Sequence, residues 1–385
     1  MRLGQRREDL PGTRRTYAQA AVATLDRDPP VDHQVAQRNT ATLWVINGGL
    51  WFGLICYCWT AWVVSGDFKT NTLGRGQEPG WYVALMRGWE VFALVGTVVI
   101  LWVFVIRPKL RDGRLSFDGL FVLGCGLMFF QEPWINWTSY QFLYSTTSIN
   151  FSSWLGHVPG WSSPNAAVIP VSIWAGTAYF WLVAIPAMAG SRFMGWLTRR
   201  TPGIGKLRLI ALTYLAFCAF DLVLETFITR TNLFSYGSVI PQLSLFAGTD
   251  HQFPVYETIS WAGTYVFLSS VHFFRDDRGR SLPERGIDAF RVGGDRLRTF
   301  LRFLAIVGIC QLSILLTYNI PYQLYALHSE MSGVYLNQPW RLAGVCGPNT
   351  NFDCPGPGVP IPRRDSKTNR VDQSPPSGRH SEPTR

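Results

Sequence analysis

Seven long apolar runs constrain this chain more than any other feature of its sequence. A helix of about 18 apolar residues or more can cross a hydrocarbon core of about 30 Å. Lipid offers no hydrogen-bond partner to an open strand edge, so each run is expected to be helical. The chain is therefore predicted to be all-α, a polytopic transmembrane helical bundle of about seven helices. The predicted spans are Leu43–Val64, Tyr82–Ile106, Leu115–Trp134, Ala166–Gly190, Leu207–Thr229, Phe253–Phe274 and Phe300–Ile320.

Basic residues alternate between the two sides of these runs. Seven Lys or Arg precede the first span, and the successive loops hold two, four, none, five, one and seven. Loops rich in Lys and Arg stay in the cytoplasm, so the N-terminus is predicted to be cytoplasmic and the C-terminal tail outside. The formal net charge of +10 then faces anionic lipid headgroups, and no nucleic-acid partner is expected.

The polar ends of the chain complete the predicted organisation. Residues 1–42 are expected to be a disordered basic cytoplasmic arm without a secretory signal, and residues 43–320 to be the bundle in a multi-pass cell-membrane protein. An outer tail, 321–358, contains Cys346 and Cys354, and residues 359–385 form a second disordered segment. The exterior is oxidising, so these two cysteines can form a disulfide there. The sequence leaves open whether they do so or remain free thiols.

Several membrane chemistries are excluded by what the runs lack. The chain has four Lys and none lies in a span, so a retinal Schiff base has no attachment point. Its six His are scattered, and no Walker A, GxGxxG or HExxH pattern occurs. No metal and no cofactor is therefore expected.

Carboxylates inside the runs need an explanation, because each costs about 2.5–3.5 kcal/mol at the centre of a bilayer. At about 1.5 Å per residue, five acidic residues fall in the outer half of the membrane. They are Glu90, Glu132, Asp221, Glu225 and Glu257. The sequence leaves two explanations open, polar links between helices and a functional cavity.

Asp221 and Glu225 are four residues apart, on one face of a helix. Repulsion between two carboxylates in a medium of low dielectric would keep one of them protonated. A protonated acid beside an ionised partner suits general acid–base catalysis. The aromatic and amide residues of the outer loops would either cover such a site or sit in the membrane interface.

The chain resembles the AveC-type spirocyclase family of actinobacterial membrane proteins from about Trp44 to Arg364. The motifs that carry the resemblance are Gln131-Glu132-Pro133 with Asn136, Trp154 with Pro159-Gly160-Trp161 and Pro164-Asn165, Asp221 with Glu225, Phe246-Ala247-Gly248-Thr249 with Gln252-Phe253-Pro254 and Glu257, the Phe274–Arg280 stretch, and the Cys346-to-Arg364 tail. The resemblance implies an enzyme that closes a hydrophobic polyketide-type dihydroxyketone into a spiroketal, and that can also dehydrate the product, without a cofactor.

Roles follow from joining the resemblance to the carboxylates. Asp221 and Glu225 are predicted to be the acid–base pair, and Glu132 and Glu257 to orient substrate or stabilise a cation. The residues predicted to bind substrate are Glu90, Asn136, Trp154, Trp161, Asn165, Tyr236 and Gln252. The expected partners are the lipid bilayer and a hydrophobic small molecule, and the oligomeric state is left open.

Two other functions use the same cavity or surface. In one, the chain binds or transports a lipid or polyketide, and the carboxylates relay protons. In the other, it is a structural partner of an enzyme that makes envelope lipids.

Overall fold

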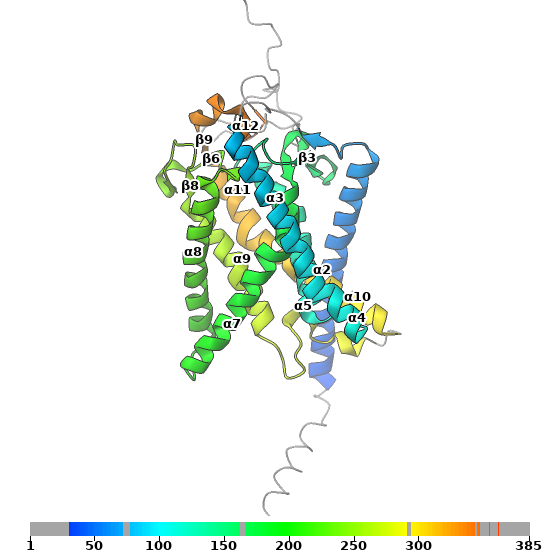
Figure 1. The fold of residues 1–385 in the computed structure, drawn as a ribbon. Coiled ribbons are helices and arrows are strands. Elements are labelled where there is room, and N and C mark those ends of the chain that lie inside the picture. Colours follow the sequence, from blue (N-terminus) through cyan, green and yellow to red (C-terminus); the bar gives the residue numbers. More distant parts are fainter. Residues whose placement is uncertain are drawn as a thin grey trace, which may run out of the picture.

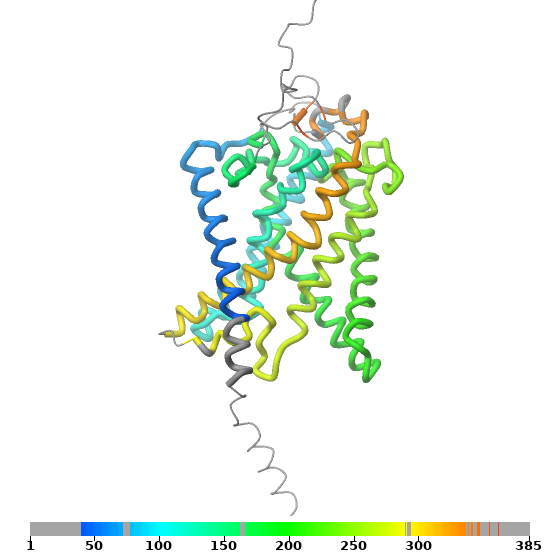
Figure 2. The backbone as a smooth tube through the Cα atoms, turned by 180° about the vertical axis from the view of Figure 1, so that it is seen from behind, coloured from blue at the N-terminus to red at the C-terminus, as the bar shows by residue number. Residues whose placement is uncertain are grey.

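The computed structural model describes residues 31–71, 78–161, 166–290 and 294–342, together with residues 345, 346, 354 and 361. Within these residues seven helical segments stand side by side as one bundle (Figures 1 and 2). Four segments change helix type along their length. In chain order they are α2 (Val31–Val64); α3 (Gly80–Leu101), η1 (Trp102–Ile106) and α4 (Arg107–Asp112); α5 (Phe117–Leu127) and η2 (Met128–Trp137); α6 (Ile173–Ala178), η5 (Tyr179–Val183) and α7 (Ala184–Arg200); α8 (Lys206–Arg230); α9 (Val255–Phe273); and α10 (Asp295–Ile314), η9 (Leu315–Asn319) and α11 (Ile320–Ala326).

The predicted all-α bundle is confirmed, and its segments divide into two kinds. Among the described residues, five segments are long and apolar enough to cross a membrane: Thr40–Val64, Gly80–Asp112, Ile173–Arg200, Lys206–Arg230 and Asp295–Ala326. The other two, α5 with η2 and α9, bury most of their side chains against neighbouring helices. Because protein surrounds them, they can carry Gly, Ser, Thr and Glu where a lipid-facing helix would carry aliphatic residues.

Four predicted boundaries are wrong. The first helix begins at Val31, so residues 31–42, expected to be part of the disordered arm, are helical. The third predicted span becomes a 3₁₀-helix from Met128 onward. This part contains Pro133, which has no N–H to donate to an α-helical hydrogen bond. The fourth begins at Ile173, because the residues before it form a short 3₁₀ turn and a strand. The last segment continues through Ala326, beyond the predicted end of the bundle at residue 320.

Glycine allows the closest helix contact, between α2 and α10. A Cβ added at Gly48 would lie 1.7 Å from the Leu304 carbonyl oxygen, and one at Gly308 would lie 2.8 Å from the Gly48 nitrogen. Small residues let helix backbones approach closely in membranes, where van der Waals packing drives association. The first and last segments of the bundle are thereby joined.

A cap of short strands covers one end of the bundle, an addition to the predicted all-α fold (Figure 1). We call this end the loop end. β1 (Thr70–Asn71), β3 (Asn150–Ser152) and β4 (Pro170–Ser172) form an antiparallel sheet, and the two-stranded pairs are β2 (Leu143–Tyr144) with β5 (Phe234–Ser235), β6 (Ser238–Val239) with β9 (Glu330–Met331), and β7 (Ser244–Leu245) with β8 (Phe253–Pro254). The short helices are η3 (Leu155–His157), η4 (Ala166–Val168), η6 (Pro241–Leu243), η10 (Gly333–Asn337) and α12 (Pro339–Leu342) in the cap, and η7 (Leu282–Glu284) and η8 (Ile287–Ala289) at the opposite end.

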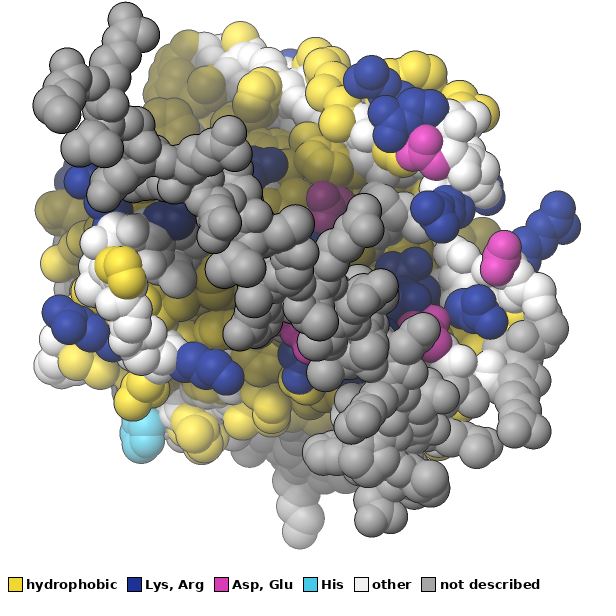
Figure 3. Space-filling view, turned by 90° about the horizontal axis from the view of Figure 1, so that it is seen from below, with side chains coloured by type: hydrophobic (Ala, Val, Ile, Leu, Met, Phe, Trp, Pro, Cys, Tyr) yellow, Lys and Arg dark blue, Asp and Glu magenta, His cyan; other side chains and the backbone are white. Residues whose placement is uncertain are grey.

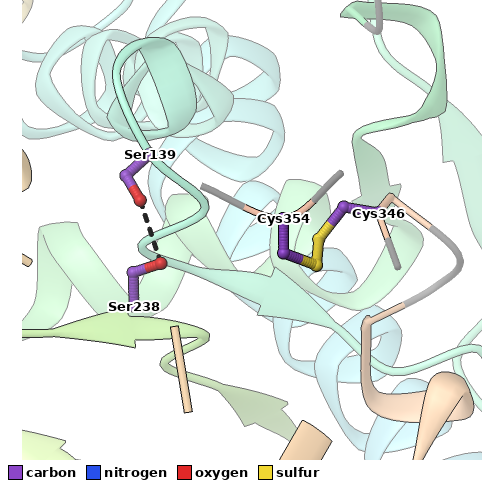
Figure 4. The surroundings of a disulfide bond; sticks show 4 residues. All are labelled: Ser139, Ser238, Cys346 and Cys354. Atoms are coloured by element: carbon purple, nitrogen blue, oxygen red, sulfur yellow. Dashed lines mark hydrogen bonds between the residues drawn. A yellow bond between two sulfur atoms is a disulfide. The ribbon is translucent and has the colours of Figure 1, made fainter. Parts of the chain in front are cut away.

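Two side-chain links hold the cap together. Cys346 and Cys354 form a disulfide bond, so of the two alternatives open from the sequence the structure has the bonded one (Figure 4). Nearby, the Ser139 hydroxyl donates to the Ser238 hydroxyl at 2.9 Å, which joins two loops about a hundred residues apart (Figure 4). The strand pairs β1–β3, β2–β5 and β6–β9 also join segments that are far apart in the chain, so the cap depends on the bundle for its shape.

The opposite end, which we call the basic end, gathers the Lys- and Arg-rich segments 107–114, 192–208, 275–290 and 294–298. Figure 3 views this end and shows many Lys and Arg side chains with few acidic ones. This arrangement agrees with the charge alternation along the sequence, and the assignment of this end to the cytoplasm stays a prediction.

Candidate functional site

A small cavity inside the loop-end half of the bundle is lined by three buried glutamates. Glu132 comes from η2, Glu225 from α8 and Glu257 from the first turn of α9. The other lining residues are aliphatic or aromatic, and no Lys, Arg or His is among them. The cavity volume is about 50 Å³, room for a small number of water molecules.

Tyrosine hydroxyl groups donate to all three glutamates. Tyr144 donates to Glu132, and Tyr236 donates to Glu225 Oε2 at 2.8 Å. Glu257 accepts one bond from Tyr318, at 3.1 Å, and another from Tyr322. Buried carboxyl groups need such partners, because a polar group left unpaired in an apolar interior costs about 1–3 kcal/mol.

The two tyrosines contributed by the cap remain protonated donors. Tyr144 and Tyr236 lie in short strands or loops outside the spans, and both are buried. Burial raises the pKa of Tyr144 well above its ordinary value, and the nearby Glu132 raises it further. Burial and the nearby Glu225 do the same to the pKa of Tyr236. Both hydroxyls therefore keep their protons near neutral pH and can hold a carboxylate in place.

Changes of helix type deliver two more tyrosines to the cavity. Tyr179 is the first residue of the π-helical turn η5, and Tyr318 lies in the π-helical turn η9. A π turn inserts one residue and shifts the face that follows, and such turns occur frequently at functional sites. Tyr144, Tyr179, Tyr318 and Tyr322 were missed by the sequence analysis, because neither hydropathy nor the spacing of acidic residues marks a tyrosine in an apolar helix or in a loop.

Asp221 lies one turn from Glu225 on α8 but does not line the cavity. Its side chain is fully buried, and neither carboxylate oxygen reaches hydrogen-bonding geometry with any described residue. The hydroxyl of Thr258 on α9 is a close polar neighbour. Asp221 is therefore a neighbour of Glu225 on α8 and not one of the residues that line the cavity.

Glu90 occupies a different interface. It is paired with Arg87, and its Oε1 accepts bonds from the Ser148 hydroxyl at 3.1 Å and the Ile149 amide at 2.6 Å. These contacts tie α3 to the loop that leads into β3. The structure places this predicted binding residue outside the cavity, where it holds a loop of the cap.

Three other predicted residues, Asn136, Tyr236 and Gln252, do not line the cavity but are hydrogen-bonded to residues at it or next to it. Asn136 brackets Phe142, a cavity residue, by donating to its carbonyl at 2.8 Å and accepting from its amide at 3.1 Å. Gln252 donates to the carbonyls of Tyr236 and Gly237 at 2.7 and 3.2 Å. Through these bonds Asn136 positions Phe142, and Gln252 positions Tyr236, which does not line the cavity but donates to Glu225.

The two predicted tryptophans belong to the cap. Trp154 stacks on Phe130 and donates its indole N–H to the Phe130 carbonyl at 3.1 Å. Trp161 packs edge-on against Trp137, with ring centroids 4.3 Å apart. Neither lines the cavity. Asn165 lies outside the described residues.

Comparison with known proteins adds a family to this geometry. A family model described as spirocyclase AveC-like matches residues 112–344, more than half of the 385 residues. The matched range contains all three cavity glutamates and the four tyrosines that donate to them. No curated protein and no solved structure matches the chain.

Proposed function

The chain belongs to the AveC-like spirocyclase family, and from that membership we propose that it closes a hydrophobic, polyketide-type dihydroxyketone into a spiroketal by acid–base catalysis. The observation that carries the proposal is the cavity itself, in which three buried glutamates held by tyrosine hydroxyls face one aromatic space. The proposed reaction uses only protons, carboxyl groups and the loss of water.

The first step forms a hemiketal. One substrate hydroxyl adds to the ketone carbon and a new C–O bond forms. An ionised glutamate takes the proton of the attacking hydroxyl, while a protonated glutamate gives its proton to the carbonyl oxygen. The two carboxyl groups have then exchanged protonation states, which prepares them for the second step.

The second step closes the spiroketal. The newly protonated glutamate gives its proton to the hemiketal hydroxyl. The C–O bond to that hydroxyl breaks, water departs, and an oxocarbenium ion forms. The second substrate hydroxyl attacks this cation, and the other glutamate takes its proton. One molecule of water is lost, no electron is transferred, and both carboxyl groups return to their starting states.

The side chains that line the cavity can supply the groups that these two reaction steps require. With no Lys, Arg or His in its lining, full ionisation of three glutamates would place uncompensated charges in an apolar space. At least one carboxyl group is therefore expected to be protonated beside an ionised one. The cation is stabilised by the remaining carboxylate and by the faces of Tyr179 and Trp261.

We assign the roles from the lining of the cavity. Glu225 and Glu257 are the proposed proton-transfer pair, and Glu132 orients substrate or stabilises the cation. Asp221, predicted from the sequence to be half of the acid–base pair, acts through Glu225, one turn away on α8. We further propose that the chain is a multi-pass protein of the cell membrane and that its acidic cavity lies in the outer half of the bilayer.

The test uses the full chain in lipid nanodiscs and a synthetic long-chain dihydroxyketone. Chiral liquid chromatography with mass spectrometry follows the initial rate and the ratio of spiroketal stereoisomers. General acid–base groups contribute about 10²- to 10⁴-fold, so Glu225→Gln and Glu257→Gln should each lower the rate at least 100-fold and lose stereocontrol.

Glu90→Gln is the matched control, because Glu90 is a buried glutamate outside the cavity. It should retain the rate of the unaltered chain. Normal cyclisation by both cavity variants would overturn the proposal. Saturable binding of the ketone without conversion would favour the binding or transport function instead.

A further inference from the structure

An apolar groove follows the outer faces of α7 and α8, below the cavity toward the basic end. Its volume is about 380 Å³, within the range of about 300–1,000 Å³ that small-molecule sites occupy. Ala189 of α7 and Ala216 of α8 are exposed on its walls. Its one polar lining side chain, Thr213, already donates its hydroxyl to the Leu209 carbonyl at 2.9 Å. The groove is therefore suited to a hydrocarbon chain.

The same two helical segments line both the groove and the acidic cavity. On the segment from α6 to α7, Leu182 lines the cavity and Ile185, three residues on, lines the groove. On α8, Phe220 lines the groove and Glu225 the cavity. The groove thus leads along one seam of the bundle toward the glutamates.

The seam is packed at the basic end and loosely closed near the cavity. α7 packs against α8, whereas α6 and η5 make at most marginal contact with it. In Figure 1 the segment containing α7 runs obliquely, near α8 at the basic end and farther from it toward the loop end. Side chains, more than helix-to-helix packing, separate the groove from the cavity.

Tyr265 of α9 is the main side chain in that partition. Its ring stacks on Phe217 of the groove, with centroids 5.1 Å apart, and packs on Trp261 of the cavity at 5.5 Å. Its hydroxyl donates to the Leu182 carbonyl at 3.0 Å. Pro186 has no N–H to give that carbonyl an α-helical bond, so the tyrosine supplies a bond that a rotamer change can release.

We propose that the groove between α7 and α8 binds the hydrocarbon chain of the substrate, which enters the acidic cavity sideways from the bilayer past Leu182 and Tyr265. The proposal rests on the proposed function for the identity of the substrate. It explains how a cavity of about 50 Å³ can serve a larger molecule, because the chain of that molecule remains in the groove while its ketone reaches the glutamates.

The first experiment maps binding without using turnover. The full chain in nanodiscs is photolabelled with a long-chain dihydroxyketone that carries a diazirine in its alkyl chain, and labelled peptides are identified by mass spectrometry. Labelling of 185–193 and 213–220 that an excess of the unlabelled ketone suppresses would support the groove. Labelling that the excess does not suppress would show that bulk lipid covers this face, and would overturn the proposal.

The second experiment fills the groove. Ala189→Trp and Ala216→Trp place a large ring on its walls, and because both alanines are exposed the fold should tolerate the change. Ile210→Trp, which alters a separate groove of about 540 Å³ on α8, is the control. Circular dichroism and gel filtration establish that all three variants fold.

Each alanine variant should cyclise a long-chain ketone at least tenfold more slowly than Ile210→Trp does, and should lose less on a short-chain ketone. Equal rates for all three variants would overturn the groove while leaving the proposed function intact. Suppressible labelling of the groove in a chain that forms no spiroketal would overturn the proposed function and leave the groove as a binding site.

Discussion

Removal of the Tyr236 hydroxyl is the sharpest test of how the cavity holds its glutamates. In Tyr236→Phe one hydrogen bond disappears, the 2.8 Å bond to Glu225 Oε2. The ring should stay in place, because Phe142, Phe234 and Phe253 surround it with centroids 5.5–5.8 Å away. The Gln252 bond to the Tyr236 carbonyl, at 2.7 Å, is a backbone contact that the substitution leaves intact.

The size of the effect follows from the kind of bond that is lost. A hydrogen bond to a charged group contributes about 1.5–3 kcal/mol, and about 1.4 kcal/mol corresponds to a factor of ten. If the bond holds Glu225 in position during proton transfer, Tyr236→Phe should lower the initial rate about 10- to 100-fold. Affinity for the ketone should change less, because the aromatic wall is preserved.

Initial rates in nanodiscs and equilibrium binding of the ketone measure the two quantities separately. Tyr335→Phe is the matched control, since Tyr335 is a fully buried tyrosine of the same cap whose hydroxyl reaches hydrogen-bonding geometry with no described residue. A rate for Tyr236→Phe within about threefold of the unaltered chain would refute the reasoning. An equal loss in Tyr335→Phe would show that disturbance of the cap, rather than the Glu225 contact, sets the rate.

Two further predictions concern stability. Gly190→Ala would bring a Cβ to 2.3 Å from Ser269 Oγ and 2.6 Å from the Phe217 ring, so overpacking should lower the free energy of unfolding by about 1–3 kcal/mol. The control Gly53→Ala has open space at its Cβ and should not lower the midpoint of thermal unfolding. Equal midpoints for the two variants would contradict the packing at Gly190. Loss of the disulfide in Cys346→Ser should lower the stability of the cap by about 2–4 kcal/mol. Proteolysis of the cap should become faster while the helical circular dichroism signal stays the same. Unchanged proteolysis would show that the cap does not depend on the bond.

Depth in the membrane could be predicted from the sequence because a helix rises by a fixed amount per residue. That rule selected Glu132, Glu225 and Glu257, and all three line the cavity. It also selected Glu90, which lies at a similar predicted depth but holds a loop of the cap. Depth is one coordinate, and the direction in which a side chain points around the bundle depends on how every helix packs.

The seven apolar runs determined by themselves that this chain is a helical bundle, because burial in lipid and backbone hydrogen bonding leave few alternatives. With the alternating basic loops they also predict that the carboxylates lie at one level. Tertiary structure alone decided which carboxylates meet. It left Asp221 out of the lining of the cavity, and it brought tyrosines from a π turn, from α11 and from the cap onto the glutamates. These contacts join segments far apart in the chain, and a π turn shifts the helical face by one residue. No local sequence pattern therefore predicts which tyrosines contact the glutamates.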